Sequence, residues 1–253
     1  MTSRGARITD ADMTGSVFIE VDLSGAVFRE VNFAGARMRG VYLDNVDIDG
    51  AIGSLRINGV EVGPLVLAEM DRVFPERTKL RPTTAAGARE AWATLEAMWA
   101  PTMTRAAKLT DEEVHRSIDD EWSFVDTQRH LVFAMDSWYR AGVLAEERPF
   151  HPLGLPFTCD IDFSAAGLDL AARPSLAEIA QVRAERSAAL RSYLDGLTDE
   201  EFHRERLSTE GLPWPRSLAR PPQDCLQVIF NEEWAHHRFA VRDLDAIAAQ
   251  DQA

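Results

Sequence analysis

The stretch Asn231–Leu244, NEEWAHHRFAVRDL, decides how the whole chain is interpreted. A pattern with steps of three and four runs through it and includes Leu226, Phe230, Glu233, His237, Ala240 and Leu244. Such spacing places residues on one face of a helix. Glu233 and His237, four residues apart, therefore meet on an otherwise apolar stripe. A buried carboxylate and imidazole need partners, and a divalent cation would satisfy both. The stretch thus predicts a helix that carries a pair of metal ligands.

A neighbouring pair, Glu232 and His236, has the same spacing. It shares a face with Phe239 and Asp243, which is a more polar stripe and more suited to solvent. We therefore favour Glu233 and His237 as ligands, with His236 as the competitor. A third interpretation leaves His237 as a core histidine hydrogen-bonded to Glu233, with no metal.

Composition excludes several classes of function. The 253 residues carry a net charge of −14, whereas a nucleic-acid partner requires a basic surface. No run of eighteen apolar residues occurs, which argues against a membrane span, and the first residues lack the apolar core of a signal peptide. Two cysteines, Cys159 and Cys225, are too few for a disulfide framework. We expect a cytoplasmic protein whose partners include neither nucleic acid nor membrane.

The first sixty residues contain a five-residue repeat. Large apolar side chains recur at Met13, Phe18, Leu23, Phe28, Phe33, Met38, Leu43 and Ile48, with a small or branched residue two positions before each. This period fits neither a helix nor a flat strand. It resembles the pentapeptide repeat family, which implies a short right-handed β-solenoid with both residues pointing inward. We assign residues 1–62 to this segment, with Leu55–Val60 as a strand that caps it.

Residues 63–253 show helical patterns instead. Long helices are predicted over Glu90–Met103 (running on toward Ala107), Trp122–Ala141, Ser175–Leu194 and Gln223–Ala249, with a Pro- and Gly-rich connection over 147–172. The sequence Ser175-Leu-Ala-Glu178 is a capping box, and the motif LTDEE at Leu109 and again at Leu197 precedes two short helices. Four long helices with two extended connections predict an all-α four-helix bundle.

Two segments resemble the DinB-like superfamily, which includes mycothiol-dependent metalloenzymes. They are WSFVDTQRHL, residues 122–131, and NEEWAHHR, residues 231–238. The resemblance implies that His130, Glu233 and His237 are metal ligands, and it covers roughly residues 68–249. Three protein ligands leave coordination positions open, which is the arrangement of a catalytic zinc site. The implied cofactors are a divalent metal, zinc with nickel or iron as alternatives, and a thiol cosubstrate.

Other polar residues offer weaker candidates. Arg238 and Arg242 could hold a carboxylate-bearing substrate, and His236 is the third candidate for a catalytic role. Asp126, four residues before His130, could orient its ring, and His151 could close over the site from the long connection. Cys225 lacks the surroundings of an activated nucleophile and is interpreted as a buried small side chain.

Two functions follow from these patterns. The favoured one is a metal-dependent enzyme that uses a low-molecular-weight, mycothiol-like thiol for transfer to, or isomerisation of, a small electrophilic substrate. A metal lowers the pKa of a bound thiol, so that the thiolate forms at neutral pH. The alternative is a non-catalytic metal-binding scaffold or dimerisation protein that uses the solenoid as an interaction surface. A homodimer is compatible with both.

Overall fold

The computed structural model describes residues 6–29, 31–50, 52–157, 163–208, 210–212, 214–215 and 219–250. The chain divides into two compact units, Met1–Ile48 and Asp49–Ala253. Residues 49–62, which we assigned to the repeat segment by sequence, group with the helical unit.

The first unit is a series of tight turns that recur every ten residues. Ser16 N–H donates to the Met13 carbonyl at 3.0 Å, and the Asp12 carboxylate accepts from the Thr14 N–H at 2.9 Å. Gly15 in this turn has a φ of +77°, which the third residue of a type II turn requires and glycine adopts without steric cost. The same two bonds recur around Leu23 and around Phe33. Three successive turns, spaced ten residues apart, are therefore equivalent.

The repeat unit differs from the prediction in its burial. Among residues 6–29 and 31–50 there is no strand, and every residue is exposed. Phe18 and Phe28, predicted to point inward, keep 59% and 55% of their surface accessible. The structure shows turns that recur with the repeat, but it does not show the closed β-solenoid.

The helical unit begins with a small hairpin, where one capping strand over Leu55–Val60 was predicted. Strand β1 (Arg56–Ile57) pairs antiparallel with β2 (Val60–Glu61) through the turn Asn58-Gly59. Both turn residues have positive φ, as Asn-Gly hairpins favour. Helix α1 (Gly63–Val73) and the 3-10 helix η1 (Pro75–Leu80) follow.

The first long helix, α2 (Ala85–Ala106), begins where the Thr84 hydroxyl accepts a hydrogen bond from the Gly87 N–H. It is longer at its start than predicted. The short helix α3 (Asp111–Val114) then opens with a reciprocal capping box between Thr110 and Glu113. Such caps satisfy the unpaired N–H groups of the first turn.

The second long helix is α4 (Phe124–Met135), capped by Ser123, and it continues as a single π-helical segment η2 (Asp136–Ala141). A π segment widens the helix locally. In the connection that follows, residues 142–157 and 163–174 are irregular apart from η3 (Ser164–Ala166), as predicted for this Pro- and Gly-rich stretch.

The third long helix, α5 (Leu176–Gly196), opens with the predicted capping box of Ser175 and Glu178. The short helix α6 (Asp199–His203) and the antiparallel strand pair β3 (Arg206–Leu207) and β4 (Ala219–Arg220) lead to the last helix, α7 (Pro222–Gln250). None of the helices in the described part of the chain combines the length and apolarity needed to cross a membrane.

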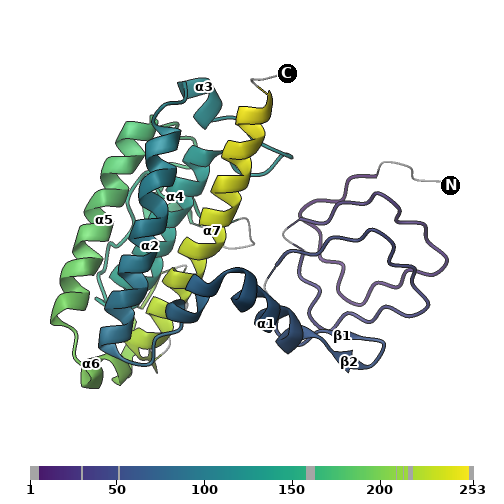
Figure 1. The fold of residues 1–253 in the computed structure, drawn as a ribbon, viewed down its shortest axis with the longest axis horizontal. Helices are drawn as coiled ribbons and strands as arrows, with labels where there is room; N and C mark the ends of the chain where they lie inside the picture. Colours follow the sequence, from purple (N-terminus) through teal and green to yellow (C-terminus); the bar gives the residue numbers. More distant parts are fainter. Residues whose placement is uncertain are drawn as a thin grey trace. The chain divides into compact units, whose positions relative to one another are not determined.

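Helices α2, α4, α5 and α7 pack side by side as a four-helix bundle (Figure 1). One core cluster joins Trp92 and Leu95 of α2 to Leu190 of α5 and Phe230 of α7. A second joins α2, α4 and α7 around Leu131, and a third joins α4 to α5. Because α4 and α7 are neighbours in the bundle, side chains on their facing surfaces can meet.

Candidate metal centre

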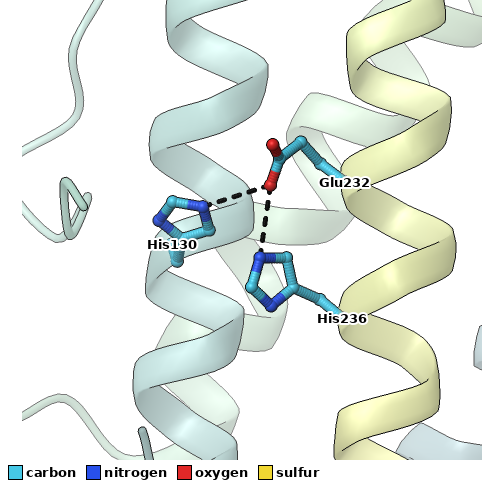
Figure 2. Close-up of side chains that lie close together, drawn as sticks. All are labelled: His130, Glu232 and His236. Atoms are coloured by element: carbon cyan, nitrogen blue, oxygen red, sulfur yellow. Dashed lines mark hydrogen bonds and ion pairs between the residues drawn. The ribbon is translucent and has the colours of Figure 1, made fainter. Parts of the chain in front are cut away.

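His130 on α4 meets Glu232 and His236 on α7. Each residue offers one ligand atom, and the three atoms lie within 4.8 Å of one another. Glu232 Oε2 is 3.3 Å from His130 Nε2 and 3.2 Å from His236 Nε2 (Figure 2). Glu232 and His236 are one helical turn apart, so α7 presents both to the same imidazole of α4.

The cluster lies at the edge of the bundle core. The side chain of His130 is 7% exposed, that of His236 is 15% exposed and that of Glu232 is 34% exposed. The imidazoles are thus largely withdrawn from water, whereas the carboxylate is accessible from solvent. A small molecule or ion can therefore reach this point without opening the core.

The backbone fixes the ring of His130. Its Nδ1 is 3.0 Å from the carbonyl oxygen of Leu155. A carbonyl oxygen only accepts hydrogen bonds, so Nδ1 carries the proton, and in the neutral ring Nε2 turns a lone pair toward Glu232. Histidines that bind metals generally donate their other ring N–H to such an acceptor.

The charge state of Glu232 supports the same interpretation. Burial raises the pKa of this carboxyl, but its contacts with the imidazoles of His130 and His236 outweigh burial and bring the pKa of Glu232 down to about 2. An ionised carboxylate facing two imidazole nitrogens needs positive charge between them. Protons on the rings or a bound cation can supply it, and a carboxylate oxygen with two imidazole nitrogens is a donor set that zinc-type ions accept.

Aromatic rings surround the imidazoles. The ring of Trp122 is centred 4.6 Å from the ring of His130 and 6.0 Å from that of His236. Phe133 lies 6.2 Å beyond His130, and its own neighbours include Phe157 at 6.2 Å. These rings limit the rotation of the imidazoles and give the site an apolar border.

The structure does not bring Glu233 to His130. Glu233 is 1% exposed, and its carboxylate receives two hydrogen bonds from the Arg183 guanidinium of α5, at 2.5 and 2.8 Å. Arg183 also lies over the ring of Trp99 at 5.6 Å. The carboxylate on the apolar stripe is therefore satisfied by an arginine from another helix.

His237 likewise has other partners. Its Nε2 is 2.9 Å from the Thr102 hydroxyl and 3.1 Å from the Met98 carbonyl on α2. The carbonyl again requires a proton on this nitrogen, and burial lowers the pKa of His237. Of the predicted set His130, Glu233 and His237, the structure places only His130 in the cluster. The competing pair, Glu232 and His236, completes it.

The two arginine candidates also have other contacts. The guanidinium of Arg238 lies over the rings of Phe74 and Trp234, and Arg242 pairs with Glu121 and Asp243. With His237, both arginines line a groove of about 490 Å³ that Met98 of α2 and Glu76 of η1 border. His236 alone among the three catalytic candidates belongs to the metal cluster.

The orienting group for His130 differs from the prediction. Asp126 exchanges two hydrogen bonds with Ser123 at the start of α4 and lies 3.5 Å from Arg129. The His151 ring accepts a hydrogen bond from the Leu153 N–H. The Leu155 carbonyl takes the orienting role, which no side-chain pattern signals.

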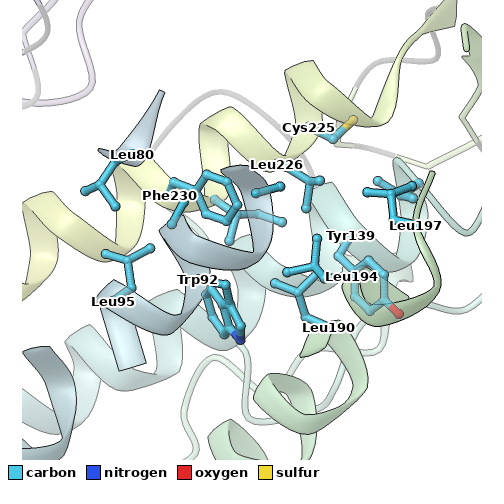
Figure 3. Packing of buried hydrophobic residues seen from close by; sticks show 14 of the residues in the cluster. Leu80, Trp92, Leu95, Tyr139, Leu190, Leu194, Leu197, Cys225, Leu226 and Phe230 are labelled. Atoms are coloured by element: carbon cyan, nitrogen blue, oxygen red, sulfur yellow. The ribbon is translucent and has the colours of Figure 1, made fainter. Parts of the chain in front are cut away.

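Cys225 is fully buried among the apolar residues of the bundle (Figure 3). Burial raises the pKa of its thiol to about 11, so the thiol stays protonated at neutral pH. This confirms the interpretation of Cys225 as a small packing residue. Cys159 lies outside the described residues.

A four-helix bundle that gathers two imidazoles and a carboxylate from facing helices defines a class of proteins with metal sites in the bundle. Comparison with family models agrees. The model described as DinB superfamily matches residues 94–240, more than half of the chain, so the chain belongs to the DinB superfamily. The matched range contains the whole cluster. Eight copies of the pentapeptide repeat model match residues 6–45. No curated protein and no solved structure matches the chain.

Proposed function

We propose that the protein is a metal-dependent enzyme that uses a low-molecular-weight thiol of the mycothiol type on a small electrophilic substrate. The reaction is transfer of the thiol or thiol-assisted isomerisation. Membership of the DinB superfamily and the convergence of His130, Glu232 and His236 support this proposal.

One observation carries the proposal. The Leu155 carbonyl holds the proton of His130 on Nδ1, so that the neutral ring points a lone pair at Glu232 Oε2, which is itself an acceptor. A proton on Nε2 would relieve one of these contacts, whereas a divalent cation would satisfy all three ligand atoms. Zinc is the ion we favour, and nickel and iron suit the same donors.

When bound there, such an ion supplies a Lewis acid that favours the thiolate form of a thiol at neutral pH. His130, Glu232 and His236 would hold it, and three protein ligands leave room for a further one. Trp122 covers the two imidazoles and limits their exposure to water. The Cys225 thiol is buried and protonated, so it does not supply the attacking sulfur, which in this proposal belongs to the external thiol.

The exposed repeat favours a second function. Apolar side chains such as Phe18, Phe28 and Ile48 keep more than half of their surface accessible, and exposed apolar surface of this kind marks interaction sites. We propose that the repeat segment serves as a docking or homodimerisation surface that covers these side chains. In that case the bundle is a metal-binding scaffold without catalysis.

The adjacent histidines of α7 provide a matched test. His236→Ala removes a proposed ligand, and His237→Ala changes the next residue, which contacts Thr102. We expect wild type and His237→Ala to bind about one zinc ion per chain, and His236→Ala to bind it about 100-fold more weakly or worse. Metal content is measured by elemental analysis of full-length protein after dialysis.

Activity is then followed with mycothiol and chlorodinitrobenzene, an electrophile whose thiol adduct absorbs light. Metal-dependent turnover that His236→Ala loses and His237→Ala retains supports the enzyme. Metal binding without turnover, across several electrophiles, favours the scaffold. Equal metal content in both variants would reject the cluster as a metal centre.

A further inference from the structure

We infer that Arg129 is a positioning residue for the candidate metal centre. It holds the connection between η2 and α5 in place, so that the Leu155 carbonyl orients the ring of His130. This inference rests on the proposed function, because its consequence is the affinity of His130, Glu232 and His236 for a metal ion.

Arg129 is buried, with 3% of its surface exposed, and its guanidinium points to the connection. Nε donates to the Leu153 carbonyl at 3.1 Å, and Nη2 donates to the Asp169 carbonyl at 2.8 Å. The Asp169 N–H in turn donates to the Pro152 carbonyl at 2.8 Å. One side chain of α4 therefore joins two parts of the connection that are sixteen residues apart.

The backbone next to this side chain continues the arrangement. The Leu155 N–H donates to the carbonyl of Arg129 at 3.1 Å, and the Leu155 carbonyl accepts from His130 Nδ1 at 3.0 Å. The Arg129 side chain thus holds Leu153, whereas the Arg129 carbonyl and the His130 ring hold Leu155. Displacement of this segment by about 1 Å would lengthen the bond to Nδ1 beyond the range of a hydrogen bond.

The chemistry of arginine suits this role. A planar guanidinium has five N–H donors in a fixed fork, so it can bind two separate carbonyl oxygens at once, whereas lysine offers a single flexible point. Among the described residues, Asp126 supplies a counter-charge at 3.5 Å on a side chain that is one-third exposed. Burying a guanidinium largely against carbonyl groups is costly. The cost is consistent with a role in holding the connection next to His130.

Loss of the Arg129 hydrogen bonds to the connection would act on the metal centre through the ring of His130. Without the Leu155 acceptor, the neutral ring can place its proton on either nitrogen. The Nε2 lone pair would then be available only part of the time. Outer-shell partners of metal-binding histidines typically change affinity by about 10- to 100-fold.

Arg129→Met and Arg129→Lys test the inference in the full-length protein. The matched control is Arg186→Lys, because Arg186 supports the same connection indirectly, at His151. Its Nε binds Asp136 at 2.6 Å, and Asp136 accepts from the His151 N–H. Long-range nitrogen–proton NMR spectra of chelator-treated protein report the tautomer of His130, which is assigned with His130→Gln. Zinc titration reports affinity, and urea unfolding reports stability.

We expect wild type and Arg186→Lys to show the Nδ1–H tautomer. Arg129→Met should show a mixture of tautomers and bind zinc about 10- to 100-fold more weakly, with Arg129→Lys between them. An unchanged tautomer and affinity in Arg129→Met would overturn the inference. If His236→Ala keeps full zinc binding, the assignment of the metal centre is rejected. The tautomer of His130 in metal-free Arg129→Met still decides whether Arg129 positions His130.

Discussion

Arg183 and Glu233 form a two-pronged ion pair inside the bundle, with nitrogen–oxygen distances of 2.5 and 2.8 Å. The pair fixes the rotation of α7. Successive residues of a helix point about 100° apart, so with Glu233 held toward α5, Glu232 faces α4 and its His130. A residue outside the cluster therefore helps to decide which residues can enter it.

Breaking this ion pair should cost much of the stability of the bundle. Arg183→Met leaves the Glu233 carboxylate buried without a counter-charge, which typically costs about 3–5 kcal/mol. The double variant Arg183→Met, Glu233→Met should recover a large part of that loss. Urea unfolding gives both values. Arg191→Met is the control, because Arg191 is 56% exposed, and such a pair contributes about 1 kcal/mol or less. An Arg183→Met cost no greater than the control would contradict the prediction.

The difference between the predicted α7 pair and the pair that faces His130 has a physical cause. The stripe through Leu226, Phe230, Glu233, Ala240 and Leu244 is indeed buried, so the periodicity identified the core face correctly. Its polar members, Glu233 and His237, bond to Arg183 and Thr102, which are 50 and 135 residues away in the sequence. No local pattern reveals these partners. The cluster forms instead on the half-buried face, where a carboxylate remains reachable from solvent.

Local chemistry was more predictable than long-range pairing. Ser175 and Glu178 form the capping box that their spacing indicates, and the turn around Gly15 follows from its glycine. The Leu155 carbonyl could not be predicted, because the main chain carries no residue-specific signal. The hairpin at Asn58-Gly59 was detectable from its turn sequence, but it was interpreted as one strand.

The depressed pKa of Glu232 predicts how pH affects the metal-free protein. The folded pKa of about 2 lies below the ordinary value of 4.5, so ionised Glu232 stabilises the fold at pH values above about 5. This contribution disappears as the pH falls through the folded pKa. Allowing for the partial exposure of the side chain, we expect Glu232→Gln to cost about 1 kcal/mol at pH 6.

Urea unfolding of chelator-treated wild type and Glu232→Gln between pH 6 and pH 3 measures the difference. It should shrink toward acidic pH. A difference that stays constant or grows as the solution is acidified would show that the carboxylate is not held by the two imidazoles.

The burial of Cys225 predicts an unreactive thiol. Its pKa is raised to about 11, so native protein at pH 8 should react with a disulfide reagent at this position at least about 100-fold more slowly than urea-unfolded protein. Cys159→Ser is used so that a single thiol is observed. Rapid reaction in the native state would mean that the thiol is accessible, and Cys225 would then be a candidate nucleophile.

Packing around Cys225 predicts a sensitive glycine. A Cβ added at Gly142 would lie 2.5 Å from the Trp138 carbonyl oxygen and 3.0 Å from Cys225 Sγ. The first contact is with backbone that cannot move aside readily. Gly142→Ala should therefore lower stability by about 1–3 kcal/mol, whereas Gly196→Ala, with open space around the added atom, should be nearly neutral in the same unfolding experiment.

Trp122 should report on metal binding. Its ring lies 4.6 Å from that of His130, and a bound Co²⁺ or Ni²⁺ ion would quench a fluorophore this close. We expect Co²⁺ to reduce the emission of wild type more than that of Trp122→Phe, with similar affinity for both. Trp92→Phe, which changes a tryptophan in a different core cluster, controls for the loss of one fluorophore. Equal quenching in wild type and Trp122→Phe would place the ion elsewhere.

Removing the repeat should leave the bundle intact. Residues 1–48 form a separate compact unit. Their described residues are all exposed, so the deletion removes no buried side chain among them. A chain of residues 49–253 should unfold within a few degrees of the full protein and bind zinc with unchanged affinity. Differential scanning calorimetry and zinc titration test this directly.

If the shortened chain also loses self-association, measured by analytical ultracentrifugation, the repeat is the assembly surface. A shortened chain that no longer folds or binds zinc would show that the bundle depends on the repeat, because the cluster residues themselves all lie on α4 and α7.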